Sequence, residues 1–177
     1  MNSVFPLIYS ILLFFILFFI SFYIIKQISN TQNSEKKIIR LQKNIQNKKS
    51  SYEDNYKLGQ LYLKRNFFSK AILLFRQALE TWDHNDKIGI GSLYNTLGFT
   101  YFNLKQYDFA IYYYKIAIHV LPDYILALKN LAYTYEKVSL YKDAYDFYQA
   151  VLVWDPNNEL VLSRMLIVER KLSLKTY

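Results

Sequence analysis

The chain has 177 residues, a formal net charge of +8, no cysteine, four glycines and three prolines. The absence of cysteine excludes a disulfide framework and a thiolate metal site. The scarcity of glycine and proline argues against an all-β fold, which needs many tight turns. The charge does not indicate a nucleic-acid-binding domain, because +6 of it falls in residues 26–50 and residues 51–177 carry only +2.

Residues 5–25 form an apolar segment without a single charged side chain. As an α-helix the segment would be about 31 Å long, enough to cross a hydrocarbon core of about 30 Å. A cleaved signal peptide would have a basic start, a shorter apolar core and a small-residue cleavage site, which this sequence lacks. A buried helix of a soluble domain is rarely apolar on every face. We therefore expect an uncleaved transmembrane anchor over residues 1–25.

Residues 26–51 are polar and glycine-free, and we expect a basic juxtamembrane spacer here. Because basic flanks stay on the cytoplasmic side of a membrane, the rest of the chain is expected in the cytoplasm or in the stroma of a plastid. Ile38, Leu41 and Ile45 have helical spacing, so part of the spacer is expected to be helical, although two heptads are too few for a coiled coil. The alternative, an RNA-contacting arm, is disfavoured because the segment lacks interleaved aromatic residues.

A pattern of small and large residues fills residues 91–124 and recurs on both sides. Its members are Tyr94, Leu97, Gly98, Tyr101, Ala110, Tyr114, Ala117 and Pro122. A shift of 34 residues finds Leu131, Ala132, Tyr135, Ala144, Tyr148 and Pro156. A backward shift of 39 residues finds Leu58, Gly59, Tyr62, Ala71, Phe75 and Ala78. The order resembles the tetratricopeptide repeat (TPR) family, whose 34-residue helix–turn–helix units stack so that neighbours bury their apolar faces.

The three units depart from the family pattern at particular positions. Val151 stands where the third unit should have a small residue, so we expect its two helices to lie slightly further apart. In the first unit, Asn55 replaces the tryptophan and Asp83 replaces the terminal proline. Five extra residues lie within the segment 82–91, which explains the longer step between the first two units.

The resemblance implies an all-α fold: an N-terminal transmembrane helix, an α-solenoid of three repeats (52–85, 91–124 and 125–158) and a C-terminal capping helix and tail (159–177). Helix pairs are expected at 52–64 with 67–80, 88–103 with 107–120, and 124–137 with 141–153. In the capping helix, Leu162, Met165, Leu166 and Leu172 fall on one side and are expected to cover the last repeat, with a polar face outward.

No catalytic site, metal site or cofactor site is predicted. His84 lies in an expected inter-repeat turn beside Asp83 and Asp86, where no second cluster completes a metal site. His119 lies late in an expected helix. The chain has no nucleophile elbow, no phosphate-binding glycine loop and no zinc-protease motif. We therefore expect a protein that is not an enzyme. The alternative, an enzyme with accessory repeats, lacks the residues for a catalytic domain.

What remains is a binding surface. In the TPR family the first helix of each pair lines a concave groove, and the register carries twelve residues onto it. They are Tyr56, Gln60, Leu63, Lys64, Asn95, Phe99, Phe102, Asn103, Lys129, Tyr133, Glu136 and Lys137. The aromatic members suit an extended or helical peptide, unless the C-terminal helix folds back over them. Repeats that clamp the C-terminal carboxylate of chaperones use Lys, Asn and Arg at five positions. None of these is matched here, so no chaperone tail clamp is expected; the residues present are Tyr56, Gln60, Thr96, Leu126 and Asn130.

The whole layout of anchor, basic spacer, three repeats and capping helix resembles the photosystem I assembly proteins of cyanobacteria and red-algal-type plastids. The many Phe, Tyr, Ile, Asn and Lys residues, which AT-rich codons encode, fit a plastid gene. The resemblance implies a single-pass thylakoid protein whose stroma-facing groove binds photosystem I subunits or assembly intermediates, with no nucleic acid. The alternative is a membrane-anchored adaptor for bacterial secretion, division or organelle import.

Overall fold

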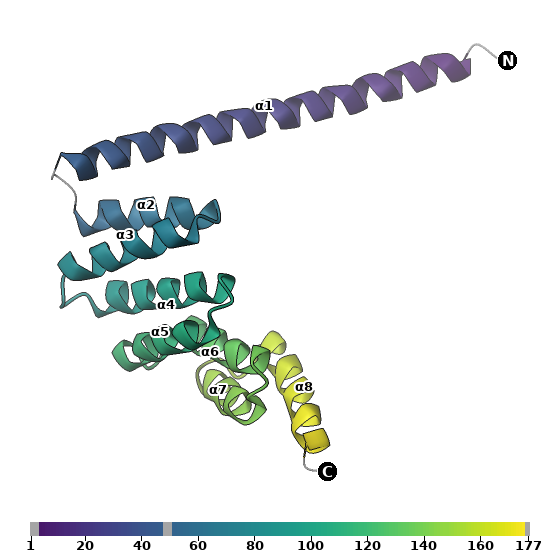
Figure 1. The fold of residues 1–177 in the computed structure, drawn as a ribbon. Coiled ribbons are helices and arrows are strands. Elements are labelled where there is room, and N and C mark those ends of the chain that lie inside the picture. The colour runs from purple at the N-terminus through teal and green to yellow at the C-terminus, as the bar shows by residue number, and fades with distance from the viewer. Residues whose placement is uncertain (1–3, 48–50, 176–177) are drawn as a thin grey trace.

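The computed structural model describes residues 4–47 and 51–175, and these residues form helices and short turns with no strand. In chain order the helices are α1 (Val4–Gln46), α2 (Tyr52–Lys64), α3 (Phe68–Thr81), α4 (Lys87–Asn103), α5 (Tyr107–Val120), α6 (Ile125–Lys137), α7 (Tyr141–Trp154) and α8 (Glu159–Lys175). Figure 1 shows α1 lying across one end of a stack of shorter helices. The all-α prediction is confirmed, and each helix from α2 to α7 begins and ends within one residue of its predicted range.

In the first two repeats, a small residue of the first helix faces an aromatic ring of the second. A Cβ atom added at Gly59 of α2 would lie 2.6 Å from the ring of Phe75 in α3. A Cβ atom added at Gly98 of α4 would lie 2.6 Å from the ring of Tyr114 in α5. Both rings are fully or almost fully buried. The small residues of the pattern are therefore required where the two helices approach closely.

The turn between the two helices of each pair has the same backbone geometry in all three repeats. Its central residue has a positive φ of 61° at Asn66, 60° at Lys105 and 61° at Ser139. The residue after it donates its backbone N–H back to the last turn of the first helix, as Phe67 does to the Tyr62 carbonyl at 2.9 Å. This is the left-handed C-terminal cap that commonly ends helices, here repeated with the period of the fold.

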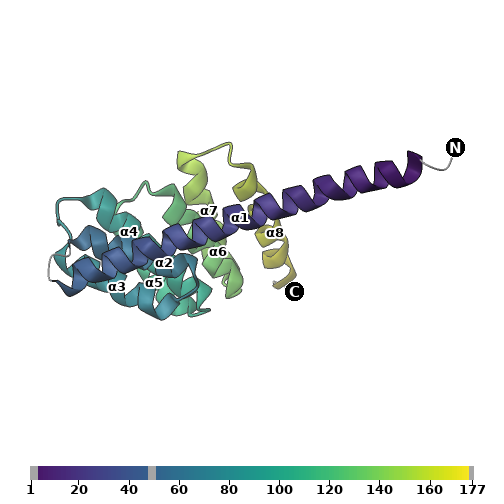
Figure 2. The same cartoon turned by 90° about the horizontal axis from the view of Figure 1, so that it is seen from above.

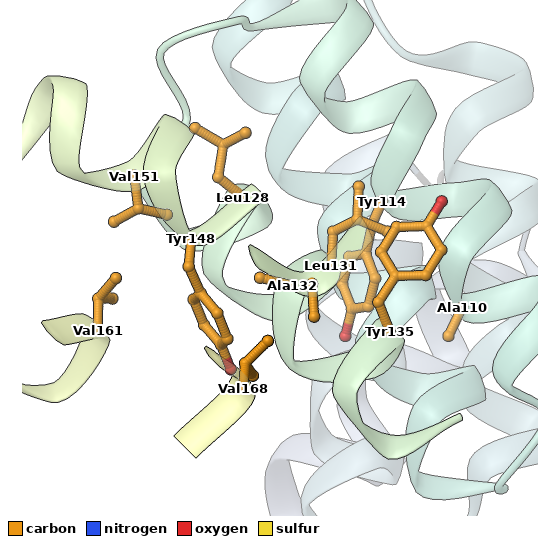
Figure 3. Close-up of a cluster of buried hydrophobic side chains, with 11 residues drawn as sticks. Ala110, Tyr114, Leu128, Leu131, Ala132, Tyr135, Tyr148, Val151, Val161 and Val168 are labelled. Atoms are coloured by element: carbon orange, nitrogen blue, oxygen red, sulfur yellow. The ribbon is translucent and has the colours of Figure 1, made fainter. Parts of the chain in front are cut away.

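The core consists of buried clusters that follow the stack. One is centred on Phe75, Leu93 and Leu97 between the first two pairs. A second joins the last two pairs to α8, where Val161 and Val168 point towards Tyr148 of α7 (Figure 3). Neighbouring repeats therefore share their apolar faces, as expected for a solenoid.

α8 packs against the last repeat through a face that matches the expected one only in part: Met165 and Leu172 pack against the core as predicted. Val161 and Val168 are buried, whereas Leu162 and Leu166 are 43% and 68% exposed, so the prediction for these two leucines was wrong. α8 lies 34 residues after α6 and keeps the register of a first helix. In α6 the residues equivalent to these leucines are buried. No further helix follows α8 in the described part of the chain to cover them.

α1 is one unbroken helix of 43 residues, about 65 Å long, that joins the apolar segment to the basic segment. Its apolar half is long enough to cross a membrane, and the part with described side chains packs against no other element. The basic half packs on the first repeat, where Ile38 and Leu41 are buried with Leu58 and Leu74. The helically spaced apolar residues of the predicted spacer therefore form the face that packs on the first repeat. The same helix continues without a break into the apolar segment.

Candidate functional site

The predicted groove is lined by the first helix of each pair, α2, α4 and α6, and α8 adds a wall at its C-terminal end. Between α6 and α8 lies a pocket of about 340 Å³, which we call the inner pocket. Its lining residues are Leu126, Lys129, Asn130, Tyr133, Tyr148, Leu160, Val161 and Arg164. The register of α8 explains the wall, because Leu160 and Arg164 occupy the positions of Leu126 and Asn130 one unit later.

Tyr133 is held between two cations at the edge of the inner pocket. The Lys137 Nζ atom and the Arg164 guanidinium carbon each lie 5.0 Å from the centre of its ring. Phe102 of α4 contacts the same ring, with ring centres 5.6 Å apart. Cations placed over an aromatic face are attracted by its quadrupole, so these residues fix the orientation of Tyr133.

Glu136 connects α8 to the third repeat. Its carboxylate accepts a hydrogen bond from the Tyr148 hydroxyl at 2.9 Å. It also forms an ion pair with Arg164 at 3.1 Å. Its side chain is only 15% exposed. Burial, and then the neighbouring Glu136, raise the pKa of Tyr148, so this hydroxyl remains a donor at physiological pH. Glu136 is thus occupied inside the protein and does not offer a free carboxylate to a partner.

The second repeat contributes an exposed aromatic side chain to the groove. Phe99 is 44% exposed. Asn103 is exposed and donates to the Phe99 carbonyl at 2.8 Å. Phe102 is half-buried between neighbouring rings. Asn95 is buried and accepts a hydrogen bond of 2.9 Å from Asn130, which links α4 to α6. Of these predicted site residues, Phe99 and Asn103 face solvent, while Asn95 and Phe102 mainly support the wall.

The first repeat offers less of a surface than its register predicts. Tyr56 is half-buried, with its ring 5.8 Å from Phe75 and 5.5 Å from Trp82. Leu63 packs against the same cluster. Gln60 is exposed. Lys64 is also exposed, but it lines a separate pocket between α1 and α2.

The structure therefore brings together the predicted residues of the second and third repeats. Phe102, Tyr133, Glu136 and Lys137 form one continuous patch with Lys129 beside it. The alternative that the C-terminal helix covers the aromatic residues holds in part, because Arg164 reaches Tyr133 while Phe99 stays exposed. Arg164 and Leu160 were missed as groove residues. Extending the 34-residue register into 159–175 would have found both.

The histidines and the inter-repeat acids form no reactive cluster. His84 and His119 are exposed. Asp86 caps α4, since its carboxylate accepts hydrogen bonds from the Gly89 N–H at 2.8 Å and from the Trp82 indole at 3.0 Å. These bonds hold the pKa of Asp86 below its ordinary value. Among the residues that the structure describes, no group of three metal-ligating side chains could hold an ion.

No protein-family model matches the chain. Three similar proteins indicate its family and its fold. The ycf37 protein of Guillardia theta is 36% identical over 172 residues, which is 97% of each chain. The chloroplastic TPR domain-containing protein PYG7 of Arabidopsis thaliana is 29% identical over 141 residues, covering 80% of this chain and 46% of PYG7. The first TPR domain of Spaghetti (RPAP3), solved with an HSP90 peptide, superposes with a TM-score of 0.62 at 19% identity, covering 70% of this chain and 94% of that domain. The last likeness shows the fold, and the first shows that this chain belongs to the ycf37 family of TPR proteins.

Proposed function

We propose that the chain is a non-catalytic scaffold of the thylakoid membrane that binds photosystem I subunits or assembly intermediates in its concave groove. The observation that carries the proposal is the combination of an exposed aromatic and cationic groove with a membrane-length apolar helix, whose basic continuation packs on the first repeat. A scaffold of this kind would keep its groove close to the membrane surface, where newly inserted subunits arrive.

The chemistry of the groove suits a peptide segment with apolar and acidic side chains. Phe99 offers an exposed ring, and Lys129 lines the inner pocket beside Arg164, whose charge is already paired with Glu136. An apolar side chain in the pocket would gain burial, and a neighbouring carboxylate would meet the Lys129 ammonium group. The similar TPR domain bound to the HSP90 peptide SRMEEVD supports a peptide as the kind of ligand.

A chaperone tail remains disfavoured as that ligand. At the clamp positions, Tyr56 is packed into the core of the first repeat, and the Asn130 amide is bonded to Asn95. Neither can present the charged or amide group that holds a terminal carboxylate.

The plastid location is supported by the relatives and by the sequence of α1. A chloroplastic TPR protein is similar to most of this chain. Basic residues follow the apolar half of α1 and none precedes it, which favours a stromal solenoid.

The test is affinity isolation of the tagged full-length protein from mildly solubilised native membranes, with copurifying proteins identified by mass spectrometry. The groove variant replaces Phe99, Phe102 and Tyr133 by alanine. A matched control replaces Tyr112, which is 58% exposed on α5, the second helix of its pair. We expect photosystem I subunits with the wild-type and control proteins and at least a tenfold loss with the groove variant. Equal recovery with all three proteins, or no photosystem I subunit with the wild type, would contradict the proposal.

A further inference from the structure

The unbroken α1 helix relates positions on the solenoid to distances from the membrane. Its uncharged run ends at Ile25, and the helix continues without interruption to Gln46. Each residue along the helix adds about 1.5 Å. If α1 crosses the membrane as proposed, the α1 residue beside any group of the solenoid therefore gives the height of that group above the hydrocarbon region.

α2 runs antiparallel to α1, so its far end turns back towards the apolar half. Near the start of α2, Asp54 accepts a hydrogen bond from Asn44 of α1 at 3.4 Å. Near the end of α2, Arg65 pairs with Glu35, nine residues earlier in α1. Figure 2 shows α1 passing over α2 and projecting beyond the stack. The turn that follows α2, residues 65–67, therefore lies on the side of the solenoid from which the apolar helix projects.

The range of heights beside this turn includes the lipid head-group layer. A pocket of about 660 Å³ lies between α1 and the end of α2, lined by Gln27 and Thr31 of α1 together with Lys64, Arg65 and Phe67. The α1 residues that line this pocket extend from Gln27 to Glu35, two to ten positions beyond Ile25, which places the pocket about 3–15 Å above the hydrocarbon region. The head-group layer on each side of a bilayer is about 5–8 Å thick.

The side chains at this turn have the chemistry of an interfacial anchor. Phe67 is 51% exposed although it is a large apolar side chain. Lys64 and Lys70 are exposed beside it, and the Lys70 Nζ atom lies 5.6 Å from the Phe67 ring centre. Glu35, the acid on the facing part of α1, is already paired with Arg65. Aromatic rings favour the membrane interface and lysines there are attracted to anionic lipids.

The two edges of the solenoid differ in charge. Lys105, in the turn after α4, lies on the same edge as the turn after α2 (Figure 1). The loop between α3 and α4, at the opposite edge, carries Asp83 and Asp86 and is followed by Lys87, so that residues 83–87 have a net charge of −1. An anionic surface would attract the first edge and repel the second.

We propose that the turn between α2 and α3 is seated in an anionic lipid head-group layer, with the Phe67 ring inserted and Lys64 and Lys70 contacting lipid phosphate or sulfonate groups. This second attachment fixes the rotation of the solenoid about α1. One edge of the groove then rests on the membrane surface, and its opening faces along that surface instead of away from it.

The absence of cysteine makes the test direct, because one introduced cysteine is the only labelling site. Full-length Phe67→Cys protein carries a nitroxide label in vesicles of equal parts phosphatidylcholine and phosphatidylglycerol. Collisions of the label with oxygen, which concentrates in lipid, are compared with collisions with a water-soluble nickel chelate. Matched labels at Leu17 in the apolar helix and at His84 on the opposite edge give the lipid and water limits.

We expect the oxygen-to-nickel ratio at position 67 to lie between these limits and several-fold above that at position 84. A ratio equal to that at position 84, with a lipid value at position 17, would overturn the interfacial seat alone. A water value at position 17 as well would show instead that α1 does not cross the membrane, which removes the basis of the proposal.

The lysines are tested in the same labelled protein. The pair Lys64→Gln and Lys70→Gln should lower the ratio at position 67 towards the value found in vesicles of phosphatidylcholine alone. The control Lys87→Gln, on the opposite edge, should leave the ratio unchanged. An equal fall with Lys87→Gln would contradict a local contact and indicate a general effect of net charge.

Discussion

Replacing Gly98 by alanine should destabilise the solenoid even though alanine is the better helix former. Gly98 lies inside α4 and faces Tyr114 of α5. An added Cβ would lie 2.6, 2.7 and 3.0 Å from the ring atoms Cδ1, Cε1 and Cγ. Tyr114 is 1% exposed, so its ring is enclosed by neighbouring side chains and cannot swing away into solvent.

Two opposing terms set the size of the effect. Alanine in place of glycine in a helix interior stabilises by about 1 kcal/mol. Ordinary carbon–carbon contacts lie at about 3.5–4 Å, so the ring or the helix would have to move by about 1 Å. Overpacking of a close-packed core costs about 1–3 kcal/mol. Because three ring atoms lie within the short range, we expect the upper part of this cost and a net loss of about 1 kcal/mol in the free energy of unfolding.

The assay is urea unfolding of the full-length protein in detergent, followed by the fluorescence of Trp82 and Trp154. A loss of this size should lower the urea midpoint by about 0.3–1 M. The control places Gly98→Ala in a Tyr114→Leu background, where the ring is absent and the alanine should be neutral or stabilising. A gain in stability from Gly98→Ala in the wild-type background would refute the close helix approach from which the cost is derived.

Three further predictions concern single sites. Lys105→Gly should raise the free energy of unfolding by about 0.5–1 kcal/mol, measured by urea unfolding, because Lys105 has a φ of 60° that costs a non-glycine residue about 1–2 kcal/mol. Arg164→Ala should loosen α8 and speed hydrogen exchange of its amides at least severalfold, with α2 and α3 unchanged, because Glu136 loses its ion pair; unchanged exchange in α8 would contradict this. The pKa of Asp86 is lowered by its bonds to the Gly89 N–H and the Trp82 indole, so its contribution is present above the unfolded-state pKa and is lost as pH falls through the folded one. Asp86→Asn should therefore weaken the fall of the urea midpoint at acidic pH. An unaltered dependence of the midpoint on pH would contradict the capping role of Asp86.

The repeat helices could be predicted closely because their information is local and periodic. Gly98, Ala110 and Tyr114 fix the spacing of one helix pair, and the 34-residue period transfers it to the next. The bounds therefore agree to within one residue. The local pattern gives the helices but not their arrangement. Their arrangement as a solenoid followed from the resemblance to the repeat family, which depends on many positions together.

The attachments at both ends of the solenoid were harder to predict, because each depends on contacts far apart in the chain. Ile38 and Leu41 show helical spacing, but nothing near them indicates that Leu58 and Leu74 cover them. In α8, Met165 and Leu172 were placed correctly against the core, but Leu162 and Leu166 were not. The observed contact face follows from the 34-residue register of the repeats, which the local pattern of leucines in α8 does not reveal.

The groove was predicted by register alone, and register does not state which side chains are already engaged. Asn95 and Glu136 occupy the predicted positions, but their polar groups are bonded within the protein. Phe99, in contrast, keeps 44% of its surface exposed. The proposed binding role of the groove therefore depends most on Phe99, Lys129 and the inner pocket.

The most direct test of that role is photocrosslinking in native membranes. A benzoylphenylalanine at position 99 reports on the groove, and the same group at Tyr112 reports on the second helix of that pair. We predict adducts with photosystem I subunits from position 99 and none from position 112. Adducts with those subunits from position 112 but not from position 99, or adducts from position 99 that contain no photosystem I subunit, would contradict the account.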